Sequence, residues 1–184
     1  MKTDIKTLLA VLLLLLPLGA KAAGSADNEF MTSRAVFTWG ASAGASIDMS
    51  SNDMSTVDFD ITLGFRRGWI NFLGLGLGAD IMVSNSCRTF PLYAELRTNF
   101  LNHPTIGFWD FKAGMALNYL EHNHQQTGVY AFTGPGFNLA RSRKFNSYIL
   151  IGYTFVQRRP INGPEMYHDF GSLHYATVKI GVSF

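Results

Sequence analysis

The chain has 184 residues, of which 15% are charged and 14% aromatic, and its formal net charge is +2. About 25% of the residues in a typical soluble domain are charged, so this chain is poor in charge. A nucleic-acid partner is disfavoured because such partners require a basic surface. The single cysteine, Cys87, excludes an internal disulfide.

The first residues have the pattern of a secretory signal peptide. Lys2 and Lys6 precede an apolar run over 8–16, and Ala20–Ala22 reads as a small-x-small cleavage pattern. A membrane-spanning helix needs about 20 apolar residues, so the alternative of an uncleaved anchor is the weaker one. We expect residues 1–22 to be removed after export.

Two further segments follow this leader. Residues 23–33 are polar and are expected to form a periplasmic lead-in, and residues 34–184 are expected to form one folded unit. Three lysines and one aspartate lie in the leader, so the remaining chain carries no formal net charge.

From residue 34 onward, apolar residues recur at every second position, which is the period of a β-strand. In 57–65, for example, Val, Phe, Ile, Leu and Phe alternate with Asp, Asp, Thr and Gly. The alternation predicts eight strands, over 34–48, 56–66, 70–83, 88–99, 105–119, 128–139, 146–157 and 173–184. Turn-like polar segments separate them, which predicts antiparallel hairpins.

The polar face of these strands distinguishes two architectures. A soluble barrel or sandwich buries its apolar face, whereas a membrane barrel turns that face to lipid. Glycine recurs on the polar face, where it would weaken a solvated strand but makes room inside a narrow bore. Charges of both signs share this face: Asp58, Asp60, Arg66, Asp80, Glu95, Arg97, Asp110, Lys112 and Lys179. We expect them to form a paired network that fills the lumen, with Glu95 bonded to Arg97 or Lys179.

The apolar face carries aromatic residues near the strand ends, as the interfacial girdles of membrane barrels do. They are Trp39, Phe65, Trp69, Phe100, Trp109, Tyr119, Phe137, Tyr153, Phe155 and Phe184. An open sheet edge in lipid would leave backbone groups unpaired, so the sheet is expected to close. The sequence therefore predicts an all-β fold, a closed eight-stranded antiparallel up-and-down transmembrane β-barrel.

Several segments resemble a known family, namely FPLYAELRTNF (90–100), FWDFKAGMALNY (108–119), GYTFVQ (152–157) and VKIGVSF (178–184). The chain resembles the small eight-stranded outer-membrane β-barrel proteins of Gram-negative bacteria, of the OmpA-barrel and OmpX type. The segments over 90–100 and 108–119 resemble in particular the small porin-like barrels of Bacteroidota. The resemblance covers residues 34–184 and implies a monomer surrounded by outer-membrane lipid and lipopolysaccharide. It also implies a transient partner, the barrel-assembly machinery, which would recognise Phe184 together with Val182 and Ile180.

With the N-terminus in the periplasm, the first strand runs outward. The extracellular loops are then expected over 49–55, 84–88, 120–127 and 158–172. The periplasmic turns are expected over 66–69, 100–104 and 140–146. The longest loop then lies outside the cell, as in known membrane barrels.

One loop offers a candidate catalytic group. Ser172, His168, His174 and Asp169 supply the residue types that outer-membrane lipid A deacylases and acyltransferases use. Serine and histidine are also common in loops, so catalysis is the alternative to a non-enzymatic role.

Other candidate residues carry weaker signals. Two histidines and one acid could bind a metal but lack further placed ligands, so no metal site or cofactor is expected. These are Glu121, His122 and His124. Three loop arginines could contact lipopolysaccharide phosphates: Arg88, Arg158 and Arg159. Cys87 is expected to be an unpaired residue of a loop or rim.

The sequence thus favours a non-enzymatic outer-membrane barrel with a filled polar lumen. Its expected role is envelope integrity or surface interaction through the extracellular loops. The alternatives are lipid A modification and a narrow pore for small solutes.

Overall fold

The computed structural model describes residues 35–50, 54–67, 70–84, 86–100, 106–119, 125–141, 145–158 and 172–184. The predicted signal peptide and lead-in lie outside the described residues. No helix within these ranges is long and apolar enough to cross a membrane.

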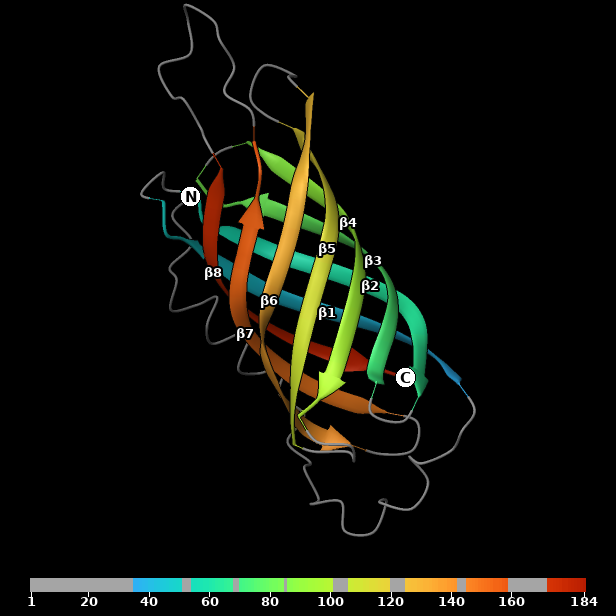
Figure 1. Cartoon of the computed structure of the whole chain (residues 1–184). Helices are drawn as coiled ribbons and strands as arrows, with labels where there is room; N and C mark the ends of the chain where they lie inside the picture. The colour runs from blue at the N-terminus through green and yellow to red at the C-terminus, as the bar shows by residue number, and fades with distance from the viewer. Residues whose placement is uncertain are drawn as a thin grey trace, which may run out of the picture.

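The described residues form eight strands that close into a single barrel (Figure 1). Each strand pairs antiparallel with its neighbours in sequence, and the first strand pairs antiparallel with the last. The strands are β1 (Val36–Asp48), β2 (Thr56–Arg67), β3 (Ile70–Met82), β4 (Arg88–Asn99), β5 (Gly107–Tyr119), β6 (Gln125–Arg141), β7 (Asn146–Val156) and β8 (Leu173–Ser183). The predicted fold class is confirmed.

Most strand bounds lie within two residues of the predicted ones, and β6 is the exception. It was predicted over 128–139 but spans Gln125–Arg141. Its first three residues are polar, yet they continue the ladder with β5, where Gln125 pairs with Tyr119. Hydrophobic alternation marks only the apolar part of a strand, whereas backbone pairing extends as far as the neighbouring strand does.

The barrel has two ends, which we name by their connections. At the loop end, β1 connects to β2, β3 to β4, β5 to β6 and β7 to β8. At the hairpin end, β2 connects to β3, β4 to β5 and β6 to β7, and there β1 begins and β8 finishes. Trp39 and Phe184 meet at the hairpin end, where their backbones exchange hydrogen bonds of 3.2 and 2.8 Å. Their rings stack at a centroid distance of 4.8 Å.

Hydrophobicity is reversed relative to a soluble protein. Apolar side chains such as Ile61 and Leu75 point outward, with 61% and 64% of their surface exposed. Charged side chains such as Asp110 and Lys112 point inward, with 0% and 2% exposed. This reversal is typical of a barrel that turns its apolar face to lipid.

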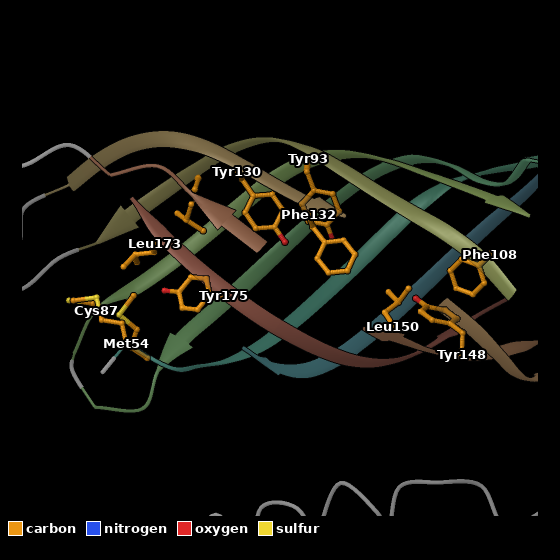
Figure 2. Packing of buried hydrophobic residues seen from close by; sticks show 13 residues of the cluster. Met54, Cys87, Tyr93, Phe108, Tyr130, Phe132, Tyr148, Leu150, Leu173 and Tyr175 are labelled. Atoms are coloured by element: carbon orange, nitrogen blue, oxygen red, sulfur yellow. The ribbon is translucent and has the colours of Figure 1, made fainter. Parts of the chain in front are cut away.

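Aromatic rings fill much of the lumen, which is the interior of the barrel (Figure 2). The buried rings belong to Phe72, Tyr93, Phe108, Tyr130, Phe132, Tyr148 and Tyr175. Glycines on neighbouring strands provide their space. A Cβ at Gly76 would overlap the Tyr93 ring, and a Cβ at Gly181 would overlap the Tyr148 ring. The inward glycines therefore act as recesses that receive rings.

Candidate functional site: the charged barrel lumen

Two groups of charged side chains lie buried in the lumen. The central cluster consists of Asp58 and Asp60 on β2, Asp80 on β3, Lys112 on β5 and Lys179 on β8. The arginine cluster consists of Glu95 and Arg97 on β4 and Asp110 on β5. Strand alternation explains both groups, because all these residues occupy positions that face the interior.

Asp60 connects the central cluster. Its Oδ2 accepts a hydrogen bond of 2.8 Å from Lys179 Nζ and one of 3.4 Å from Lys112 Nζ. Ser42 on β1 donates a third bond of 3.1 Å to the same oxygen. The Lys112 ammonium also lies 4.8 Å from the centre of the Tyr93 ring and donates to its hydroxyl at 3.4 Å. One carboxylate thus holds two cations from different strands.

Two further carboxylates border this arrangement. Asp58 accepts hydrogen bonds from Ser46 and from Thr56, and its Oδ2 lies 3.7 Å from Lys179 Nζ. Asp80 is directly opposite Asp58 in the β2–β3 pairing. Asp80 Oδ1 has no hydrogen-bond partner among the residues that the structure describes. The central cluster therefore holds three carboxyl groups and two ammonium groups.

The arginine cluster lies nearer the hairpin end. Arg97 forms an ion pair with Glu95, lies 3.5 Å from Asp110 and donates a 2.8 Å hydrogen bond to the Tyr148 hydroxyl. Its guanidinium also lies over aromatic rings, 4.2 Å from the centre of Tyr148 and 5.1 Å from that of Phe72. Carboxylates, a hydroxyl and cation–π contacts together stabilise this cation.

The structure brings together eight of the nine charged residues predicted to face the lumen. Glu95 pairs with Arg97, whereas Lys179, the other partner considered for it, contacts Asp60 and Asp58. The ninth residue, Arg66, lies at the hairpin end of β2, opposite Val36, and its side chain is half-buried.

Two of the four candidate catalytic residues lie in the described part of the chain. His168 and Asp169 lie outside the described residues. Ser172 and His174 occupy outward positions at the loop end. His174 Nδ1 is hydrogen-bonded to the Tyr153 hydroxyl, and its ring contacts the rings of Tyr153 and Phe155. The structure thus pairs this histidine with a tyrosine.

The remaining candidates differ in position. Glu121, His122, His124 and Arg159 lie outside the described residues, and Arg88 is exposed at the loop end. No group of histidine, cysteine and acidic residues in the described ranges could hold a metal ion. Cys87 is a free thiol and is buried at the loop end.

The expectation of a surface position for Arg158 is wrong, because only 4% of its surface is exposed. Arg158 continues the inward alternation of β7 beyond the end of the strand. Val156 and Arg158 are buried, whereas Gln157 between them is exposed.

The interior aromatic residues were absent from the sequence-based candidates. Tyr93 and Tyr148 complete both charge clusters through their hydroxyls. Strand alternation could have predicted that these tyrosines face the lumen. Tyr93, for example, stands two residues before Glu95 and therefore lies on the same face of its strand.

Comparisons with known proteins bear on the fold. No family model matches the chain. No curated protein sequence matches it at a significant level either. Among solved structures, Neisserial surface protein A is similar with a TM-score of 0.56 and 15% sequence identity, over 82% of this chain and 97% of that one. The N-terminal β-barrel domain of OprF from Pseudomonas aeruginosa is similar with a TM-score of 0.50 and 15% identity, over 82% and 100%. The fold is therefore that of the small eight-stranded outer-membrane β-barrels, which confirms the resemblance noted in the sequence.

Proposed function

We propose that this chain is an integral outer-membrane protein with a sealed lumen, which serves envelope integrity or surface interaction without catalysis. Support comes from the barrel fold and from the outward apolar face, which suits lipid and not water. The proposed orientation places the loop end outside the cell.

One observation carries the sealed lumen: hydrogen bonds cross the bore between strands that are not neighbours. Lys112 on β5 and Lys179 on β8 both reach Asp60 on β2. Nearer the hairpin end, Arg97 on β4 reaches Tyr148 on β7. A solute moving along the axis would have to break both sets of bonds. Buried, hydrogen-bonded charges are costly to separate, so these crossings oppose conduction.

Conductance tests this proposal directly. The purified, folded barrel in a planar bilayer is expected to show no current steps. The Lys112→Ala/Lys179→Ala variant removes both cations that cross the centre, and it is expected to show small steps if it folds. Its heat-modifiable gel mobility reports folding. Regular current steps from the wild-type barrel would overturn the sealed lumen.

A deletion strain tests the cellular role. It is expected to become more sensitive to detergents and large antibiotics, and expression of the wild type or of Ser172→Ala is expected to restore normal resistance equally well. Mass spectrometry of lipid A is expected to give the same acyl chains in all strains. An acyl-chain difference that Ser172→Ala abolishes would overturn the non-enzymatic role.

A further inference from the structure

A third polar group lies in the lumen at the loop end, separate from the two charge clusters. It consists of Arg158, just after β7, Thr89 on β4 and Asn118 on β5, all of them buried. Arg158 Nη2 donates a 3.3 Å hydrogen bond to Thr89 Oγ1. Thr89 Oγ1 in turn donates a 2.8 Å bond to Asn118 Oδ1. We call these three residues the Arg158 group.

The other contacts of Arg158 are poor matches for a cation. Nη1 lies 3.5 Å from Met54 Sδ, and Nη2 lies 3.9 Å from Met82 Sδ. A thioether sulfur is a weak acceptor and carries no charge. In the described part of the chain, no ion pair joins Arg158 to a carboxylate.

The Arg158 group has donors to spare. Arg158 Nε and Asn118 Nδ2 are both buried without a hydrogen-bond partner among the described residues. In the charge clusters the unpartnered atoms are acceptors instead, such as Asp60 Oδ1 and Glu95 Oε2. The two residues with unused donors are linked through Thr89, and an acceptor-rich anion is the ligand that such donors complement.

The surroundings of the guanidinium strengthen this preference. Figure 2 shows Met54, Cys87, Leu173 and Tyr175 gathered at one end of the buried cluster, and Arg158 contacts the first of these. Apolar walls lower the local dielectric, which strengthens the attraction between a cation and an anion.

The charge of Arg158 is secure under ordinary conditions. Burial lowers the pKa of its guanidinium, whereas nearby Tyr175, Cys87 and Asp48 raise it. Because arginine is not deprotonated in proteins, the group remains a cation at neutral pH.

We propose that Arg158, Thr89 and Asn118 form a binding site for a small free oxyanion, a phosphate or a carboxylate, at the loop end of the lumen. A guanidinium binds either group through two parallel N–H donors. Its Nε is available for one of them, and Asn118 Nδ2 supplies a further donor. Because Arg158 points into the barrel and away from lipid, a free anion suits the site better than a lipid headgroup.

Calorimetry on the full-length barrel in a neutral maltoside detergent tests the proposal. Inorganic phosphate and acetate are titrated separately, with chloride at equal ionic strength as the reference and vesicles containing phosphatidylglycerol as the lipid arm. We expect saturable binding of phosphate or acetate. Arg158→Gln should weaken it about tenfold or more, which corresponds to about 1.4 kcal/mol. The matched control Arg88→Gln removes an exposed arginine from the same end and should leave binding unchanged.

Two readouts separate binding from misfolding. The first is heat-modifiable mobility, which shows whether each variant forms the barrel. The Thr89→Val variant is included because it disturbs the site without removing the positive charge of Arg158. In NMR spectra the Arg158 Nε–H resonance should shift with added anion in the wild type. The proposal is overturned if wild-type protein shows no saturable binding, if Arg88→Gln weakens it as much as Arg158→Gln, or if only the lipid arm binds.

Discussion

Asp60 offers the sharpest test of the central cluster. Its carboxylate accepts bonds from Lys179 at 2.8 Å, Lys112 at 3.4 Å and Ser42 at 3.1 Å, and all four residues are buried. Asp60→Ala would leave two ammonium groups in the lumen without the carboxylate that they share. We expect a large loss in the free energy of unfolding.

The size of that loss follows from the contacts that remain. Removing one partner of a buried ion pair costs roughly 3–5 kcal/mol. Here Lys179 keeps Asp58 at 3.7 Å, and Lys112 keeps the Tyr93 hydroxyl at 3.4 Å. These weaker contacts place Asp60→Ala at the lower end, about 3 kcal/mol. Asp60→Asn keeps an acceptor oxygen and should cost less, about 1–2 kcal/mol.

Equilibrium unfolding in guanidinium chloride, with the barrel in lipid vesicles, measures these losses through tryptophan fluorescence. Trp39 lies on the outer face and reports the transfer from lipid to water. A double-mutant cycle of Asp60→Asn with Lys179→Met should give a coupling of at least about 1 kcal/mol. Arg88→Gln, which removes an exposed charge, should change stability by less than about 0.5 kcal/mol. A loss below about 1 kcal/mol for Asp60→Ala, without coupling, would refute the reasoning and indicate a lumen that water solvates freely.

Two further substitutions test the packing of the barrel. Gly76→Leu places a side chain where the Tyr93 ring lies and should prevent refolding, whereas Gly76→Leu/Tyr93→Ala should refold better, as judged by heat-modifiable mobility. Equal failure of both variants would contradict the assignment of this glycine as a recess for the ring. Phe184→Ala removes the stack on Trp39 and the contact with Phe145 and should cost about 1 kcal/mol in vesicles, where no assembly machinery is present. Unchanged stability in vitro, combined with poor membrane levels in cells, would assign Phe184 to recognition alone.

The strands could be predicted because their signal is local. Each inward residue is followed by an outward one, so hydrophobicity alternates wherever a strand crosses the apolar layer. Beyond that layer the hydrophobic alternation ends, so the sequence pattern predicts a loop at Gln125 and the two residues after it. Their place in β6 depends on pairing with β5, which the hydrophobic pattern of β6 does not contain.

The lumen shows the same limit. The alternation of side chains along each strand places Asp60, Lys112 and Lys179 on the lumen face. The i, i+2 spacing also predicts that Glu95 can pair with Arg97. The bonds of Asp60 to both lysines depend on the strand register and on the curvature of the closed sheet. Neither the register nor the curvature can be predicted from the local sequence pattern of a single strand.

Arg158 illustrates how composition can mislead. It stands in a run of two arginines before a proline, which is typical of an exposed loop. The alternation of β7, however, continues through Val156 to Arg158, and following it two residues further would have predicted an inward side chain.

The pairing of β1 with β8 runs from Gly40 opposite Ser183 to Asp48 opposite Tyr175. This seam joins the two strands that are farthest apart along the chain, so it is the slowest contact to find during folding. Until β8 arrives, β1 and β7 each present an open row of hydrogen-bonding groups that can recruit a strand from another chain. The contact that leaves the finished barrel without edges is missing from every unfinished copy, and such copies are prone to aggregate until the pairing of β1 with β8 forms.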